Sequence, residues 1–230
     1  MKKARVLGIG VATLDIYVNC GRMYPGGNEY NVACHAAALG ADAGFLGVFA
    51  KNPAGELLEK TLNKFSVCLS RCRHEEGSSG YSLVQLMEDG DREFLAWNQD
   101  GVTERYPIAF TEEELEYIRE YQVVSVGRCA SVSLDNIRKM KEYGIDVCYD
   151  FQEIFSEEDI RTIAPMLRYA IFSCSHLEEE EIKHTLKYAV EQGAEIAIGT
   201  RGPLSVFAYD GKQYYEQETC KVEQVVDALG

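Results

Sequence analysis

The sequence has no uninterrupted apolar stretch of the roughly 20 residues that a membrane-spanning helix needs. The apolar segment near its N-terminus is broken by Asp15 before any convincing cleavage site, which argues against a secretory signal peptide. The chain also lacks internal repeats, low-complexity tracts and a Pro/Ser-rich linker. We therefore expect a single domain over residues 1–230, located in the cytoplasm.

The sequence is short of basic residues. Its 23 Lys and Arg stand against 37 Asp and Glu, which gives a formal net charge of −14 at pH 7. Such a surface repels phosphate backbones and anionic lipids, so nucleic acids and membranes are not expected partners. A phosphate-bearing ligand would need a local site made from backbone N–H groups, a helix N-terminus or a bound cation.

Thiol and metal chemistry have little support in the sequence. The 8 cysteines contain no CxxC pair, and the 4 histidines have no spacing typical of a metal site or a catalytic triad. Most of the cysteines stand within apolar stretches. We therefore expect them to be small, reduced core residues.

What the sequence does contain is a regular alternation of strand and helix patterns. This alternation favours an α/β fold, with a mostly parallel sheet and helices on both faces. Strands are predicted at residues 4–10, 43–49, 123–126, 146–149, 170–172 and 195–198, and helices at 28–39, 53–65, 131–142, 156–168 and 178–192.

Four segments depart from this rhythm. Residues 13–18 predict a short strand, and residues 21–28 predict a turn-rich break after it. Residues 81–97 predict a β-hairpin with Asp89-Gly90 at its turn, of a kind that often forms a lid. Residues 204–217 predict a second hairpin.

Several polar residues follow predicted strands. Ligands bind beyond the carboxyl ends of the strands in such sheets, which places Asp150, residues 173–178 and residues 200–202 on one rim. Thr200 and Gly202 offer a hydroxyl and backbone N–H groups that suit a phosphate, or they form an ordinary exit from a strand. Glu178 begins a run of glutamates, which is either a solvated helix start or a source of a magnesium ligand.

The N-terminal region holds two further candidates. Asp15 has apolar neighbours, so it is either buried with hydrogen-bond donors or a ligand, or it is a turn residue. Gly26, Gly27, Asn28 and Asn31 surround a predicted helix start. They either let backbone approach a ligand or form a plain turn with Asn28 as the N-cap.

A glycine pair earlier in the chain permits another interpretation. Gly8 and Gly10 could begin a dinucleotide-binding fingerprint, but Thr13 stands where the third glycine is required. A tight turn is therefore the favoured interpretation.

Taken in order, these segments resemble a known family. The strand with Asp15, followed by GGNEYNVACHAAALGADAGFLGVFAKNPAGE, is similar to the N-terminal signature of ribokinase-like carbohydrate kinases, the PfkB family. The closing KVEQVVDALG is similar to the start of the family's second signature, and MYPGGN, LAWNQDGV and YDFQEIFSEEDI resemble segments of its fructoselysine kinases. The resemblance covers the whole chain. It implies a ribokinase-like three-layer α/β sandwich with a small β lid formed by residues 12–25 and 78–100.

The resemblance also implies an activity, the transfer of the γ-phosphoryl group of ATP to a sugar hydroxyl. The cofactors would be ATP and Mg²⁺, with K⁺ as a further option, and a homodimer through the lid is expected. The residues that would hold the sugar are Asp15, Gly26, Gly27, Asn28, Asn31 and Asn98. The residues that would serve the nucleotide side are Thr200, Gly202 and Gly230 for ATP, Glu178 for the magnesium water shell and Asp227 for K⁺.

Three features depart from the family pattern. Ser175 stands where the family has Asn, Ala228 stands where it has Thr, and the sequence ends at Gly230, before the family's Ala-Gly-Asp. By resemblance that Asp is the general base, so we expect the catalytic residue to lie beyond Gly230. We then expect a piece of a longer kinase that is impaired alone. The alternative is a non-catalytic sugar- or nucleoside-binding remnant of the same fold.

Overall fold

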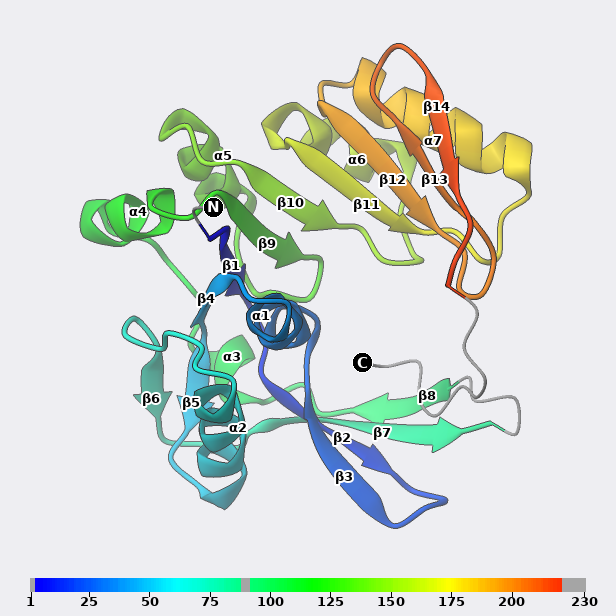
Figure 1. Cartoon of the computed structure of the whole chain (residues 1–230). Helices are drawn as coiled ribbons and strands as arrows, with labels where there is room; N and C mark the ends of the chain where they lie inside the picture. The colour runs from blue at the N-terminus through cyan, green and yellow to red at the C-terminus, as the bar shows by residue number, and fades with distance from the viewer. Residues whose placement is uncertain (1–2, 88–91, 221–230) are drawn as a thin grey trace.

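The computed structural model describes residues 3–87 and 92–220, and one large sheet forms its centre (Figure 1). The strands follow the order β14-β13-β12-β11-β10-β9-β1-β4. Those from β12 to β4 are parallel, whereas β13 and β14 are antiparallel. The predicted mostly parallel α/β fold is confirmed. The strand bounds are β1 Arg5–Ile9, β4 Asp42–Leu46, β9 Val123–Gly127, β10 Val147–Asp150, β11 Tyr169–Ser173, β12 Ile196–Thr200, β13 Val206–Tyr209 and β14 Tyr214–Gln217.

Helices cover both faces of this sheet. Phe45 and Leu46 are adjacent on β4, so their side chains point to opposite faces. Phe45 packs in one buried cluster with Tyr30 and Leu58, whereas Leu46 packs in another with Ile118. The two clusters are the cores between three layers. The helix bounds are α1 Asn28–Ala38, α2 Pro53–Lys64, α3 Val102–Arg105, α4 Glu112–Arg119, α5 Leu134–Glu142, α6 Glu157–Ile163 and α7 Glu179–Glu191, with a 3₁₀ turn at Ala164–Met166.

A second sheet of four strands has the order β3-β2-β7-β8 and extends away from the large sheet (Figure 1). Residues 21–28 were expected to be a turn-rich break, and this prediction is wrong. The chain turns after Tyr17, and Arg22 pairs back with Tyr17 as the first residue of β3. Pro25 is tolerated because β3 is an edge strand of this sheet. The bounds are β2 Thr13–Tyr17, β3 Arg22–Gly26, β7 Gly80–Leu86 and β8 Arg92–Trp97.

Neither face of the four-stranded sheet is fully covered. Met23 and Tyr24 are adjacent on β3, so they point to opposite faces, and they are 56% and 46% exposed. Tyr24 shares its face with Asp15, its pairing partner on β2, and Trp97 on β8 lies on the same face, opposite Ser82. The remaining small sheet pairs β5 (Val48–Ala50) with β6 (Arg73–Glu75).

All the cysteines are free, as expected, but the expectation that they lie in the core is only partly right. Cys34 and Cys174 are buried. The exposed cysteines are Cys20, Cys68, Cys129 and Cys220. Among the helices of residues 3–87 and 92–220, none combines the length and the apolar character that a membrane crossing requires.

Candidate functional site

The carboxyl ends of the parallel strands form one rim, as predicted. Asp150 ends β10 beside Gly127, which ends β9, and Ser173 ends β11 beside Thr200, which ends β12. Asp150 and Thr200 therefore lie two strands and two residues apart, about 12 Å at the usual spacings. A small ligand at Asp150 and a phosphate at Thr200 would be neighbours.

Asp15 and Gly26 meet between β2 and β3. Asp15 is buried, with 7% of its surface exposed. A Cβ at Gly26 would lie 1.9 Å from Asp15 Oδ2, so any other residue at position 26 would displace the carboxylate. Gly27 has a φ of 116° and passes close to the Val11 carbonyl, which also requires glycine. The paired glycines and the carboxylate thus belong to one place, as the sequence predicted.

Asn28 is the first residue of α1 and not its N-cap. The N-cap is Gly27, and no side chain caps this helix end. Asn28 Nδ2 instead donates a hydrogen bond to Asp150 Oδ2 at 3.0 Å. The alternative of a plain turn capped by Asn28 is therefore wrong. Asn31, one helical turn along, is half-buried on the same helix.

Glu29 is a site residue that the sequence analysis missed. Its side chain is fully buried, and its carboxylate accepts hydrogen bonds from Val11 N and Asn28 Nδ2, each at 3.4 Å. Burial raises the pKa of Glu29 to about 7, and the nearby charge of Asp150 adds to the effect. A glutamate in the first turn of a helix is ordinarily exposed, so the sequence offered no direct signal.

The glycines around Glu29 explain its burial. A Cβ at Gly10 would lie 2.3 Å from Glu29 Oε2, and a Cβ at Gly127 would lie 2.6 Å from Glu29 Oε1. At Gly8 a Cβ would lie 2.1 Å from the Glu29 carbonyl oxygen. Gly8 and Gly10 were interpreted as a tight turn. They are instead the floor of a slot for Glu29.

Asn98 holds the base of the β7–β8 pair. Its Oδ1 accepts a hydrogen bond from Tyr81 N at 2.7 Å, and its Nδ2 donates one to Ser79 O at 3.1 Å. Its side-chain amide is therefore engaged with backbone and holds these strands together.

The predicted nucleotide-side residues lie at the other part of the rim. Thr200 Oγ1 donates to Phe172 O at 3.3 Å, and Gly202 has a φ of 58° with open space where a side chain would be. Glu178 is exposed and is the N-cap of α7, where its backbone N donates to Glu181 Oε2 at 2.9 Å. Asp227 and Gly230 lie outside the described residues.

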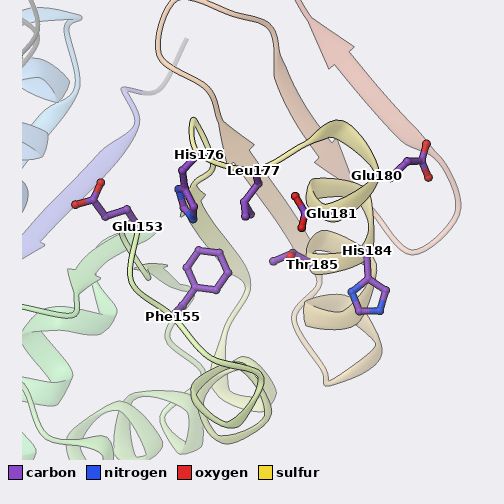
Figure 2. A pocket seen from close by; sticks show the side chains of 8 residues that line it. All are labelled: Glu153, Phe155, His176, Leu177, Glu180, Glu181, His184 and Thr185. Atoms are coloured by element: carbon purple, nitrogen blue, oxygen red, sulfur yellow. The ribbon is translucent and has the colours of Figure 1, made fainter.

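A shallow cavity of about 470 Å³ lies next to this part of the rim (Figure 2). The labelled side chains come from the loop after β10, from the loop between β11 and α7 and from α7 itself, and they include Glu180 and Glu181 of the predicted glutamate run. Although His176 and His184 both line it, the described part of the chain holds no group of three or more side chains able to bind a metal.

These features define a ribokinase-like α/β protein with a candidate site on its rim. The structure is similar to Arabidopsis thaliana ribokinase complexed with ribose and ATP, with a TM-score of 0.82 and 18% identity over 100% of this chain and 82% of that one. Its TM-score to a fructokinase from Xylella fastidiosa with bound ATP is 0.74, at 15% identity over 96% of this chain and 75% of that one. The chain belongs to the pfkB family of carbohydrate kinases, whose sequence model matches residues 4–230.

Two sugar-derivative kinases are similar to the chain in sequence over most of its length. The chain is 28% identical to the fructosamine kinase FrlD of Bacillus subtilis, over 98% of this chain and 78% of the relative. It is 26% identical to the fructoselysine 6-kinase of Escherichia coli, over 96% of this chain and 82% of the relative.

Proposed function

We propose that this chain acts as an ATP-dependent kinase on a hydroxyl of a fructosamine such as fructoselysine. The observation that carries the proposal is the close approach of Asp15 to Gly26. It places a buried carboxylate beside backbone that has no side chain, so a polyol can contact both. The fructosamine and fructoselysine kinases among the relatives support this choice of substrate.

In this proposal, the sugar lies between the four-stranded sheet and the start of α1. Asp15, Asn28 and Asn31 would bind its hydroxyls, because carboxylates and amides supply the acceptors and donors that hydroxyls need. Gly26 and Gly27 would bring backbone against the ring, and Asn98 would hold the strands beside it.

The nucleotide would lie along the ends of β11 and β12. The open turn at Gly202 fits a phosphate, since its backbone is uncrowded, and Thr200 would serve the phosphate by turning its hydroxyl hydrogen away from Phe172 O. ATP supplies the phosphoryl group when bound. Glu178 suits the water shell of Mg²⁺, which proteins hold through one or two carboxylates, waters and substrate phosphates. Gly230 for ATP and Asp227 for K⁺ remain proposals from the resemblance alone.

A base must take the proton of the attacking hydroxyl. We assign this role to the Asp of the family's Ala-Gly-Asp, which would follow Gly230, and to no described residue. A form that carries this Asp is expected to turn over about 10²–10⁴-fold faster than the 230 residues alone, the usual contribution of a general base.

The four-stranded sheet is proposed as the lid. Its Asp15 face would cover the sugar and exclude water, and its Met23 face would pack against a second copy of the chain. The exposed apolar side chains on this sheet support both roles, because each face needs a cover that the single chain does not supply.

The proposal is tested by calorimetry and by ADP release, with fructoselysine, fructose, ribose and a nucleoside as ligands. Each measurement uses the 230-residue chain and a form that continues through Ala-Gly-Asp. We expect fructoselysine to bind both forms most tightly and the longer form to release ADP with it. If both forms bind sugar and neither releases ADP, the chain is a non-catalytic binding module. If no sugar binds to either form, the sugar site itself is wrong.

A further inference from the structure

The carboxylate of Glu29 is buried next to Asn28, one of the proposed sugar ligands. It lies in the slot formed by Gly8, Gly10 and Gly127, with no surface exposed, so it cannot touch a ligand. Within residues 3–87 and 92–220, no lysine or arginine forms an ion pair with it. A buried, unneutralised carboxylate costs stability, and such groups are found where they serve a function.

Glu29 reaches the rim through one neighbour, Asn28. Asn28 Nδ2 carries two hydrogens, and it has two carboxylates within reach: Glu29 Oε1 at 3.4 Å and Asp150 Oδ2 at 3.0 Å. Asp150 is held in turn by Gln152 N, which donates to its Oδ1 at 2.8 Å. When both carboxylates are ionised, both amide hydrogens are used. The part of Asn28 that remains for a ligand is its carbonyl oxygen.

We propose that Glu29 is a positioning residue that fixes the side-chain amide of Asn28 so that its oxygen, and not its nitrogen, faces the sugar. This inference rests on the proposed function for the identity of the ligand. Together with Asp15 and Asp150, an oriented Asn28 makes this part of the site a set of hydrogen-bond acceptors. Such a set selects ligand groups that donate, which are hydroxyls and a protonated amine, and it disfavours carboxylates and phosphates.

Protonation of Glu29 removes the charge that strengthens its bond from Asn28 and turns one of its two oxygens into a donor, so the amide is held less firmly. Burial and the charge of Asp150 raise the pKa of Glu29 to about 7, so the orientation of Asn28 is expected to loosen as the pH falls below 7. Burial also raises the pKa of Asp150. The titratable groups that interact with Glu29 or Asp150 are Cys148 and Tyr149 on β10 and Cys129 after β9, while Arg128 beside them pairs with Asp159.

The first test needs no ligand and no activity. The side-chain ¹H–¹⁵N amide signals of Asn28, assigned by their loss in Asn28→Ala, are followed from pH 5 to pH 9. In the wild-type chain we expect them to shift with a midpoint near 7, and in Glu29→Gln we expect that shift to be absent. The exposed Glu142 on α5 supplies the matched control Glu142→Gln, in which the wild-type titration should persist. A shift that persists in Glu29→Gln would belong to Asp150 and would overturn the proposal.

The second test measures fructoselysine affinity by calorimetry at pH 6 and pH 8. Glu29→Gln keeps a side-chain oxygen that can accept from Asn28 but loses the charge, so it should weaken binding by up to about tenfold at pH 8, the difference between a charged and a neutral hydrogen bond, and should bind equally at both pH values. The wild-type chain should bind more weakly at pH 6. A general structural defect would instead weaken binding equally at both pH values and leave the wild-type pH dependence in the variant, which would overturn the positioning role. If Glu29→Gln does not fold, the wild-type chain decides through the backbone N–H of Val11, which donates to Glu29: its signal should titrate with the same midpoint as Asn28, and a different midpoint would overturn the proposal. If the wild-type chain binds no sugar, the proposed function fails, and the Asn28 titration still tests the orientation by Glu29.

Discussion

Asn28 and Asp150 are 122 residues apart in the chain, yet Asn28 Nδ2 donates a hydrogen bond to Asp150 Oδ2 at 3.0 Å. This contact joins the start of α1 to the end of β10, so the N-terminal glycine motif and the central sheet share one site. A ligand held there would lie beside the strand ends that carry the proposed nucleotide residues.

We expect Gly26→Ala to abolish sugar binding while the fold survives. A Cβ at this position would lie 1.9 Å from Asp15 Oδ2, so the carboxylate must move out of its place. The cost in unfolding free energy should be about 1–3 kcal/mol, which is typical of overpacking. Gly144→Ala is the control, because its φ of 72° makes alanine unfavourable with no neighbour within 4 Å. Calorimetry should find sugar affinity lost only in Gly26→Ala; equal affinities in the two variants would contradict the role of Asp15.

Glu29→Gln should change how stability depends on pH. The pKa of Glu29 rises from its ordinary 4.5 to about 7 in the folded chain, so folding favours the protonated form. The wild-type chain therefore loses stability as the pH rises from 4.5 to 7, by at most about 3 kcal/mol, and the loss levels off above pH 7. The variant lacks this loss. Urea unfolding should therefore show that its free energy of unfolding rises relative to that of the wild-type chain between pH 5 and pH 8. If the difference in stability between the variant and the wild-type chain does not vary with pH, the pKa of Glu29 is not raised by burial.

Asn98→Ala should weaken both the lid and sugar binding. The substitution removes the hydrogen bonds to Tyr81 N and Ser79 O, at a cost of about 1–3 kcal/mol. Asn19→Ala is a close match, because Asn19 makes the same pair of bonds to the backbone of Leu86 at the far end of β7. Thermal unfolding should show similar losses in both variants. Only Asn98→Ala should reduce sugar affinity; a similar reduction in Asn19→Ala would mean that general loosening of the sheet is responsible.

Thr200→Val should weaken ATP binding and leave sugar binding unchanged. The replacement keeps the shape of the side chain at the end of β12 but removes the hydroxyl that the proposal gives to a phosphate. Nucleotide affinity should fall about tenfold, as for one hydrogen bond to a charged group. Thr61→Val, at a half-buried position of α2 where the hydroxyl likewise donates to a backbone oxygen, is the control and should bind ATP as the wild-type chain does. Unchanged ATP affinity in Thr200→Val would remove Thr200 from the nucleotide site.

Met23→Glu should separate a dimer into single chains. Met23 is 56% exposed on the lid face that points away from Asp15, and a charge there would be buried by a second copy. Sedimentation velocity should show a dimer for the wild-type chain and a monomer for the variant. Glu93, already charged and exposed on β8, gives a control in Glu93→Gln, which should remain dimeric. A monomeric wild-type chain would end the proposal of a dimer.

The sequence predicted the parallel sheet and its rim well, because strand and helix periods are local properties of the chain. The prediction failed at β3, where Gly21 and Pro25 are typical of a turn and the pairing with β2 that overrides them is not local. Glu29 was missed for a similar reason. Its burial depends on absent side chains at Gly10 and Gly127, and Gly127 lies nearly a hundred residues further along the chain.

Trp97 is the sole tryptophan of the sequence, and 61% of its surface is exposed on the same lid face as Asp15. The protein therefore carries its own optical reporter. Emission of a water-exposed indole should move to shorter wavelength when a sugar draws the lid shut. The emission wavelength should not change on dilution, because a dimer would separate at the Met23 face, which is the opposite face of the lid.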